Sequence, residues 1–282
     1  MSGELPLVRQ LTARFGVAPA GEVWAGDDAA VLRAPAGPLL LAIDPVVDGV
    51  HVRLGRDTAA DVGWRAMARN LSDLAAMGAR PVAAVCSLVV PDPCTWDLDE
   101  LAEGVALAAE AYACPVVGGD VTTGPGLVVT VAVAGTVDDG GPPPVLRSGA
   151  RPGDVVLVTN PLGGRPRRPT PRVAEGAAAR WGGASAMIDT SDGLPLDLRR
   201  LADASGVGTE LDVVPVVDGG ELDWGDDYEL VVTAPDAATL VRSFEAAGLE
   251  LPIEMGRCTA TPGVHLLGEG EMPEGGWEHR WS

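Results

Sequence analysis

The sequence predicts a two-lobed α/β fold, with an α+β arrangement in its N-terminal lobe. Apolar segments of strand length alternate with segments of helical pattern along the chain, which is typical of α/β proteins. The alternation starts again at RSGARPGD (147–154), so we expect an N-terminal lobe of residues 1–147 and a C-terminal lobe of residues 148–282. A chain of 282 residues, 46% of them hydrophobic, is long enough to build a core in each lobe.

In the N-terminal lobe, apolar runs predict buried strands and flanking cap residues predict helices. The run LLLAI (39–43) is one such buried strand. Asp57 and Thr58 are expected to start the first long helix and Gly78 to stop it. Hairpin-like strand runs interrupt the alternation, which favours a mixed or antiparallel sheet. The predicted elements are strands at 39–43, 82–90, 115–120 and 127–137 and helices at 57–79 and 97–113.

The C-terminal lobe repeats this alternation of strands and helices. Its first strand is followed by a loop rich in Gly, Pro and Arg, NPLGGRPRRPTPR (160–172). Asp236 precedes a predicted helix, as Asp97 and Asp57 do in the other lobe, and all three fit the N-cap position. The predicted elements are strands at 155–159, 185–189, 209–216, 228–235 and 251–256 and helices at 195–205 and 236–248.

The charge of the chain excludes several classes of partner. The net charge is −20, which argues against nucleic acid or an anionic membrane. All basic residues are arginine, so neither a Walker-A lysine nor the strand lysine of protein kinases is possible. The cysteines show no CxxC pairing, and the sequence shows no signal peptide and no apolar run long enough to span a membrane. We therefore expect a cytoplasmic protein with reduced thiols.

Aspartates recur beside glycines and at the ends of predicted apolar strands. A carboxylate within NLSDLAAMGAR (70–80) is costly to bury unless something pairs with it. Carboxylates brought together repel one another unless protons or cations bridge them. The set offers oxygen ligands without His or Cys, which favours Mg²⁺, a cation that normally accompanies phosphates. The candidate ligands of a shared site are the aspartates of GDD (26–28), Asp44, Asp73, Asp120, Asp189 and Asp192.

Each of these aspartates also has a structural alternative, because an Asp after a strand is often a turn or cap residue. A nucleotide site would have to use Mg²⁺, backbone amides and Arg, since the chain contains no GxGxxG or GxxxxGK[ST]. Gly26 and the pair Gly118 and Gly119 would let backbone amides approach a phosphate. Arg147, at the lobe junction, is a candidate phosphate ligand, with an ordinary surface arginine as the alternative.

Seven motifs resemble those of thiamine-monophosphate kinases, members of the aminoimidazole-ribonucleotide synthetase superfamily. The resemblance covers nearly the whole chain. NLSDLAAMGA and SDGL together are specific, whereas GGD alone is weak. The motifs, in order, are GDDAAVL (26–32), ARNLSDLAAMGA (68–79), GGDVTTG (118–124), RSGARPGD (147–154), RPTPRV (168–173), IDTSDGL (188–194) and GDDYEL (225–230).

The resemblance implies a fold, a reaction and partners. The sheets of two N-terminal lobes would close into a barrel across a homodimer interface. The γ-phosphoryl group of ATP would pass directly to thiamine monophosphate, assisted by several Mg²⁺ ions and without a phosphoenzyme. Phosphoryl transfer needs positioning and charge neutralisation more than covalent chemistry, so the missing lysine is compatible with this reaction.

The resemblance also implies roles for individual residues. A lone His in an apolar strand is more often a core residue, so only the match makes His51 a substrate ligand. The tail GGWEHRWS offers Trp277, with Trp281 as the alternative, for an aromatic substrate contact. The metal positions are Asp28, Asp44, Asp73, Asp120, Asp189 and Asp192; the ATP positions are Gly119, Asp120, Arg147 and Ser191; the substrate positions are His51, Asp226 and Trp277.

Three departures from the family pattern leave alternatives open. Ala42 and Ile43 stand where the family has a Ser/Thr pair, Asp226 stands where it has Glu, and the C-terminal lobe is shortened. One alternative is therefore a relative that binds Mg-nucleotide, or only dimerises, without turnover. Another is a different ATP-using member of the superfamily. However, selenophosphate synthetases require an N-terminal reactive Cys or selenocysteine, and hydrogenase-maturation members require a C-terminal Cys, and the chain has neither.

Overall fold

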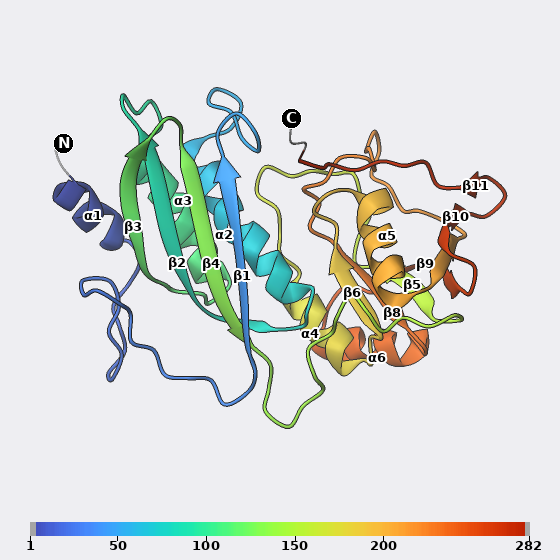
Figure 1. Ribbon diagram of the computed structural model, residues 1–282. Coiled ribbons are helices and arrows are strands. Elements are labelled where there is room, and N and C mark those ends of the chain that lie inside the picture. The colour runs from blue at the N-terminus through green and yellow to red at the C-terminus, as the bar shows by residue number, and fades with distance from the viewer. Residues whose placement is uncertain (1–3, 280–282) are drawn as a thin grey trace. The chain divides into compact units, whose positions relative to one another are not determined.

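The computed structural model describes residues 4–279, which form two compact units (Figure 1). The first unit contains the chain up to Leu71 together with Pro81–Asp139. The second unit contains Ser72–Arg80 and the chain from Gly140 onward. The second unit thus takes a short piece of the N-terminal half of the sequence, and this piece includes Asp73.

The first unit is built on a mixed sheet with strand order β1-β4-β2-β3. Strands β1 and β4 are antiparallel, whereas β2 and β3 are parallel, so the predicted mixed sheet is confirmed. Helix α1 was not predicted from the sequence. The elements are α1 (Glu4–Thr12), β1 (Leu39–Val47), α2 (Ala59–Ala75), β2 (Arg80–Pro91), α3 (Leu98–Ala111), β3 (Val116–Gly124) and β4 (Val128–Thr136).

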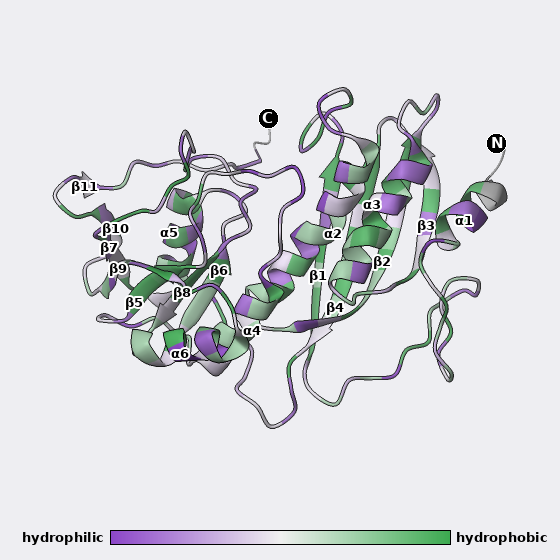
Figure 2. Cartoon of the chain, turned by 180° about the vertical axis from the view of Figure 1, so that it is seen from behind, coloured by the Kyte–Doolittle hydropathy of each residue, from purple (hydrophilic) through white to green (hydrophobic). Residues whose placement is uncertain are grey.

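Helices α2 and α3 lie on the same face of this sheet, as the two opposite views in Figures 1 and 2 show. The two helices approach closely at two glycines. A Cβ on Gly63 would lie 2.1 Å from the carbonyl oxygen of Leu101, and a Cβ on Gly104 would lie 2.0 Å from that of Ala60. Any larger residue at either position would push the helices apart.

The three predicted helix starts have caps among the predicted residues, and only Asp57 does not act as one. The carboxylate of Asp97 accepts hydrogen bonds from two backbone N–H groups of α3, and Asp236 does the same for helix α6 (Ala237–Ala247). At α2 the hydroxyl of Thr58, the second residue of the predicted pair, accepts from the N–H of Asp61. Asp57 accepts from the N–H of Arg53, so its predicted role as a cap is wrong.

The opposite face of the first sheet is apolar and exposed. In β1, Leu39, Leu41 and Ile43 are 57%, 75% and 65% exposed, and Val85 of β2 is 43% exposed. The prediction that residues 39–43 form a buried strand is therefore wrong about burial. Strand β1 is at the edge of the sheet, and its alternate residues point away from the helices.

Two predicted strand ends are also wrong. Strand β1 continues past Asp44 to Val47, because an edge strand tolerates Pro45. Strand β3 continues past Asp120 to Gly124, so GGD lies within a strand and not in a turn. Its Gly119 is required by packing, since a Cβ there would lie 1.8 Å from the carbonyl oxygen of Cys86 on β2.

The second unit contains a mixed sheet with strand order β11-β10-β7-β9-β5-β8-β6. The sequence predicted most of its elements, but α4, β10 and β11 were not predicted, and β7 ends at Leu211, short of residue 216. The further elements are β5 (Val155–Val158), α4 (Val173–Trp181), β6 (Ala186–Asp189), α5 (Leu194–Ser205), β7 (Gly208–Leu211), β8 (Leu230–Ala234), β9 (Ile253–Thr259), β10 (Gly263–Leu266) and β11 (Gly270–Glu271).

This sheet separates two apolar cores. Helix α5 packs on one face, with Leu198 and Leu201 against Val156, Ile188 and their neighbours. Helices α4 and α6 pack on the other face, with Phe244 fully buried in that core. The last turn of α2 contributes Ala75 to the same core. Within residues 4–279, no helix is both long and apolar enough to cross a membrane.

Candidate functional site

Three loop segments of the second unit meet through backbone hydrogen bonds. The N–H of Asp226 donates to the carbonyl of Ser191 (3.0 Å), and the N–H of Trp277 donates to that of Asp192 (2.8 Å). The N–H of Tyr228 donates to the carbonyl of Thr190 (3.1 Å). We call residues 190–193, 225–229 and 275–277 the loop junction. It brings together four residues that the sequence marked for function: Ser191, Asp192, Asp226 and Trp277.

The backbone of the loop junction makes a close approach that requires glycine and adopts two left-handed conformations at non-glycine residues. A Cβ on Gly225 would lie 1.7 Å from the carbonyl oxygen of Ser191, so only glycine permits this approach. Asp226 and Tyr228 adopt left-handed conformations, with φ of 72° and 56°. The hydroxyl of Tyr228, which is fully buried, donates to Oδ1 of Asp226 (3.0 Å). Such conformations are costly for residues with side chains and concentrate at functional sites.

Two acidic residues that the sequence marked for metal binding belong to this unit. Asp189 is the last residue of β6 and is 3% exposed. The hydroxyl of Ser72 donates to its Oδ2 at 2.6 Å. Asp73 follows Ser72 directly in the chain, so the hydrogen bond of Ser72 fixes the part of α2 that carries Asp73 to the end of β6. The prediction that Asp189 ends a strand is confirmed, and Asp73 is half-buried.

Asp192 is part of an ion-paired group at the start of α5. Its carboxylate binds Arg200 (2.5 Å), and Arg200 also binds Asp197 (2.9 Å). The N–H of Asp192 donates to Asp197 (2.9 Å). Burial raises the pKa of the Asp197 carboxyl to about 7, and the negative charges of Asp189 and Asp192 add to this effect. Sequence reasoning missed Asp197, whose only signal was its position in the first turn of the helix after SDG.

A second buried network holds the loop 160–172. Glu229, 7% exposed, accepts from the Nε (2.8 Å) and Nη2 (2.6 Å) atoms of Arg172 and from the hydroxyl of Thr159 (2.6 Å). Asp227 accepts from the N–H groups of Gly163 (2.7 Å) and Arg165 (3.0 Å). Burial raises the pKa of Asp227. Both carboxylates belong to GDDYEL, so this motif anchors the loop as well as supplying Asp226.

Aromatic rings lie beside the loop junction. Trp224 and Trp277 have ring centroids 6.5 Å apart and ring planes inclined by 28°. The guanidinium carbon of Arg165 lies 5.2 Å from the centre of the Trp224 ring. His279 meets Trp277 edge to face at 6.1 Å. The alternative candidate from the sequence, Trp281, lies outside the described residues.

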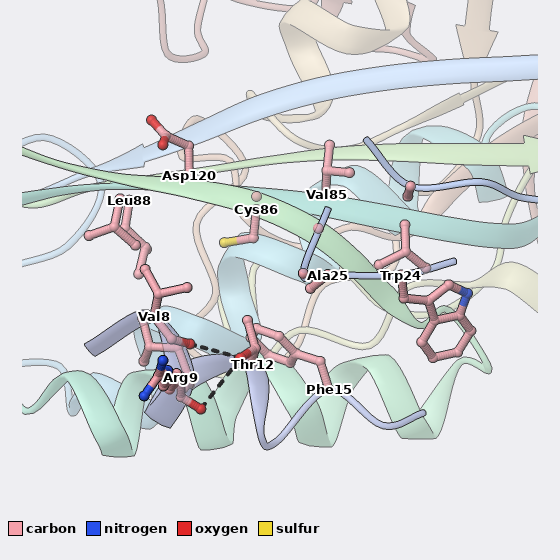
Figure 3. A pocket seen from close by; sticks show the side chains of 18 of the residues that line it. Val8, Arg9, Thr12, Phe15, Trp24, Ala25, Val85, Cys86, Leu88 and Asp120 are labelled. Carbon is pink, nitrogen blue, oxygen red and sulfur yellow. Dashed lines mark hydrogen bonds between the residues drawn. The ribbon is translucent and has the colours of Figure 1, made fainter. Parts of the chain in front are cut away.

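The first unit contains a cavity of about 660 Å³ beside β3 (Figure 3). In Figure 3, Val8 and Thr12 of α1, and Phe15 just after it, face Cys86 and Leu88 of β2 across the cavity. Burial raises the pKa of the Cys86 thiol to about 12, so it is a neutral apolar group. The charged residues that line the cavity include the predicted ligands Asp28 and Asp120, and Gly119 also lines it.

The other candidates of the first unit occupy separate places. Asp44 faces α2, with its carboxylate 3.7 Å from Nε of Arg69, whereas Figure 3 shows Asp120 pointing away from α1. Strands β4 and β2 stand between β1 and β3, so three strand spacings separate Asp44 and Asp120 by at least about 14 Å across the sheet. Within residues 4–279, no three His, Cys, Asp or Glu side chains gather closely enough to hold a metal ion. The shared metal site thus stays a prediction.

His51 and Arg147 also differ in their surroundings. His51 lies in the loop after β1, where its Nδ1 accepts from the N–H of Val47 (3.0 Å). This hydrogen bond places the proton of the neutral ring on Nε2. Arg147 is exposed, and its carbonyl accepts from the hydroxyl of Ser205 (3.0 Å). The backbone of Arg147 is therefore fixed while its guanidinium reaches into solvent.

Comparisons with known proteins extend over most of the chain. Residues 26–137 match the family described as AIR synthase related protein, N-terminal domain. The thiamine-monophosphate kinase of Rhodopirellula baltica is 35% identical over 272 residues, which cover 85% of each chain. The crystal structure of the Stenotrophomonas maltophilia K279a thiamine-monophosphate kinase is 30% identical, with a TM-score of 0.81 over 95% of this chain and 97% of that one.

A further solved structure includes ligands. AaThiL complexed with AMPPCP and TMP is 28% identical, with a TM-score of 0.75 over 90% of this chain and 91% of that one. These similarities confirm the mixed α/β fold and the family resemblance that the motifs indicated.

Proposed function

Because the chain belongs to the thiamine-monophosphate kinase family, we propose that it transfers the γ-phosphoryl group of ATP to thiamine monophosphate, giving thiamine diphosphate. The observation that carries this proposal is the loop junction, where Ser191, Asp192, Asp226 and Trp277 are joined by backbone hydrogen bonds. The related AaThiL structure, complexed with AMPPCP and TMP, supports ATP and thiamine monophosphate as the two substrates.

The carboxylates fit Mg²⁺, which prefers hard oxygen ligands. The buried Asp189 carboxylate, together with Asp73 and Asp192, would offer such ligands in the second unit. Asp28, Asp44 and Asp120 would supply ligands from the first unit. When bound, Mg²⁺ neutralises charge on the phosphates, which the chain cannot do with lysine.

The remaining residues bind and orient the two substrates. The cavity beside β3 is large and apolar enough for a nucleotide base, with Gly119 and Asp120 in its wall. Arg147 and Ser191 would contact the phosphates of ATP. His51, Asp226 and Trp277 would hold thiamine monophosphate so that its phosphate faces the γ-phosphoryl group. No side chain forms a covalent intermediate, and the rate comes from positioning and charge neutralisation.

We also propose a homodimer whose N-terminal sheets form a barrel. The exposed apolar face of Leu39, Leu41, Ile43 and Val85 supports this arrangement, because an isolated chain would leave it in water. The separation of Asp44 and Asp120 supports it too, since carboxylates from two copies can complete a site that one copy leaves open. In this proposal residues 1–147 bind metal and nucleotide and dimerise, and residues 148–282 form the shortened second lobe. Free cysteines among the described residues support a cytoplasmic location.

A second candidate function is Mg-nucleotide binding without turnover. The ion pair between Asp192 and Arg200 favours it, because this carboxylate already has a cationic partner. The replacement of the family's Ser/Thr pair by Ala42 and Ile43 favours it as well.

The test is incubation of the purified protein with ATP, Mg²⁺ and thiamine monophosphate, followed by chromatographic detection of thiamine diphosphate. An EDTA control establishes the metal requirement. Product that depends on Mg²⁺ would support the kinase. Absence of product, with Mg-ATP binding intact by calorimetry, would favour the non-catalytic relative.

A further inference from the structure

Trp224 stands beside the predicted substrate residue Trp277 and has no role assigned so far. The two rings are 46% and 41% exposed, so each presents a face to solvent. Fully overlapped rings in contact would place their centroids about 3.5–4 Å apart. At 6.5 Å the two rings overlap only in part, which leaves ring surface uncovered for another aromatic group.

A cation already lies on the Trp224 ring. The guanidinium of Arg165 is 5.2 Å from the ring centre, within the range of a cation–π interaction. Arg165 is exposed and left-handed (φ 43°), and its N–H is held by Asp227. Trp224, which directly precedes the loop junction, thus has a ring face that a positively charged group can contact.

The backbone fixes Trp224 relative to the substrate residues. Gly225 packs directly on the carbonyl of Ser191, and the N–H of Asp226 donates to the same carbonyl. Trp277 is fixed to the neighbouring carbonyl of Asp192. Trp224 therefore cannot shift far from Asp226 and Trp277 without breaking these contacts.

We propose that Trp224 is a second substrate-contacting aromatic residue, which receives an aromatic cation together with Trp277 and in competition with the guanidinium of Arg165. This inference rests on the proposed function, because thiamine monophosphate contains such a cation, its thiazolium ring. The carboxylate of Asp226, two residues away in the chain, adds a negative charge that favours the same cation.

The chain offers a matched control. Trp181, at the end of α4, is 56% exposed and also has an arginine on its ring, with the guanidinium carbon of Arg180 at 5.3 Å. Trp181 is outside the loop junction. A W181A variant therefore removes an exposed Trp that has an arginine on its ring, although Arg180 itself is buried, without touching the proposed substrate site.

The test measures binding and turnover separately. Calorimetry gives the Kd for thiamine monophosphate without ATP, and steady-state assays give KM for both substrates, in wild type, W224A, W224F and W181A. We expect W224A to raise the Kd and KM for thiamine monophosphate about tenfold, because a desolvated cation–π contact strengthens binding by about that factor. The KM for ATP should not change, W224F should recover most of the affinity, and W181A should match wild type.

A neutral analogue identifies the group that contacts the ring. Tetrahydrothiamine monophosphate, in which the thiazolium is reduced, should bind wild type and W224A with the same Kd. An equal loss for both compounds in W224A would overturn the assignment of the cation to Trp224.

The two proposals fail in different ways. Turnover by wild type with an unchanged Kd in W224A would overturn the role of Trp224 and keep the kinase. Binding by wild type that W224A weakens, without any turnover, would support Trp224 and contradict the kinase. Failure of wild type to bind thiamine monophosphate would overturn the role of Trp224. A near-UV circular dichroism spectrum and a Tm near wild type would show that each variant is folded.

Discussion

The pair formed by Arg172 and Glu229 should be essential for the stability of the second unit. Their side chains are 20% and 9% exposed, and Arg172 donates two hydrogen bonds to the carboxylate. Substituting Arg172→Met would leave Glu229 nearly buried without a counter-charge. Breaking a buried pair costs about 3–5 kcal/mol, and partial exposure of Arg172 favours the lower end, about 3 kcal/mol.

The expected fall in Tm follows from this value. Each 1 kcal/mol shifts Tm by about 2–4 °C in chains of this size, so R172M should melt about 6–12 °C lower in differential scanning calorimetry. Arg257 offers the control, because it pairs with Glu254 at 3.5 Å and both side chains are more than half exposed. R257M should change the free energy of unfolding by less than about 0.5 kcal/mol.

A double-mutant cycle separates the pair from the rest of the network. In R172M/E229Q the buried charge is also removed, so part of the stability lost in R172M should return. If R172M melts within 2 °C of wild type while R257M behaves as expected, the idea that Glu229 depends on Arg172 is wrong. The same variant should also disturb loop 160–172, which a fall in limited-proteolysis resistance at that loop would reveal.

Three further predictions concern the metal site, the first sheet and pH. Asp73→Asn should leave the fold intact and lower kcat at least about a hundredfold. A metal ligand stabilises the transition state by several kcal/mol, and each 1.36 kcal/mol changes the rate about tenfold. An unchanged kcat in the folded protein would contradict the role of Asp73. Gly119→Ala should destabilise the protein by about 1–3 kcal/mol in urea unfolding, because the added Cβ would lie 1.8 Å from the carbonyl oxygen of Cys86. Gly118→Ala should be tolerated, because the nearest atom to its Cβ is Cγ1 of Val85 at 3.9 Å. Equal destabilisation by the two variants would refute this reasoning. In metal-free protein, the folded-state pKa of Asp197, about 7, lies above the ordinary value of 3.8, so the folded state binds more protons between these values. The stability of wild type relative to Asp197→Asn should therefore fall as the pH rises from about 4 to about 7, and a flat difference across that range in urea unfolding would contradict the burial argument.

Much of the fold could be predicted because caps and apolar runs are local signals. Asp97 and Asp236 mark helix starts through hydrogen bonds to the next two or three residues, and the sequence shows this directly. Helix α4 has no such signal: its first residues carry no side-chain cap, and its small residues show little apolar periodicity. Strand β1 was predicted as buried because its composition does not reveal that it lies at the edge of a sheet.

The candidate site likewise has residues that the sequence predicted and residues that it did not. Motif wording was sufficient to select Ser191, Asp192, Asp226 and Trp277, and their backbones do meet at the loop junction. The roles of Asp197 and Glu229 depend on partners that only the folded chain brings near, such as Arg200 and Arg172. No periodicity in the sequence predicts the distances between these carboxylates and their arginine partners. The joint use of the aspartates by metal ions stays a prediction.

The short segment Ser72–Arg80 limits how the chain can be recombined with its relatives. It belongs to the second unit, where Ser72 donates to Asp189 and Ala75 packs in the core beside Gly176. A chimera with a single crossover near residue 140 would combine this segment from one parent with a core from the other. Such hybrids should be poorly soluble unless residues 72–80 are exchanged as well. The two units therefore cannot be exchanged between relatives by a single crossover.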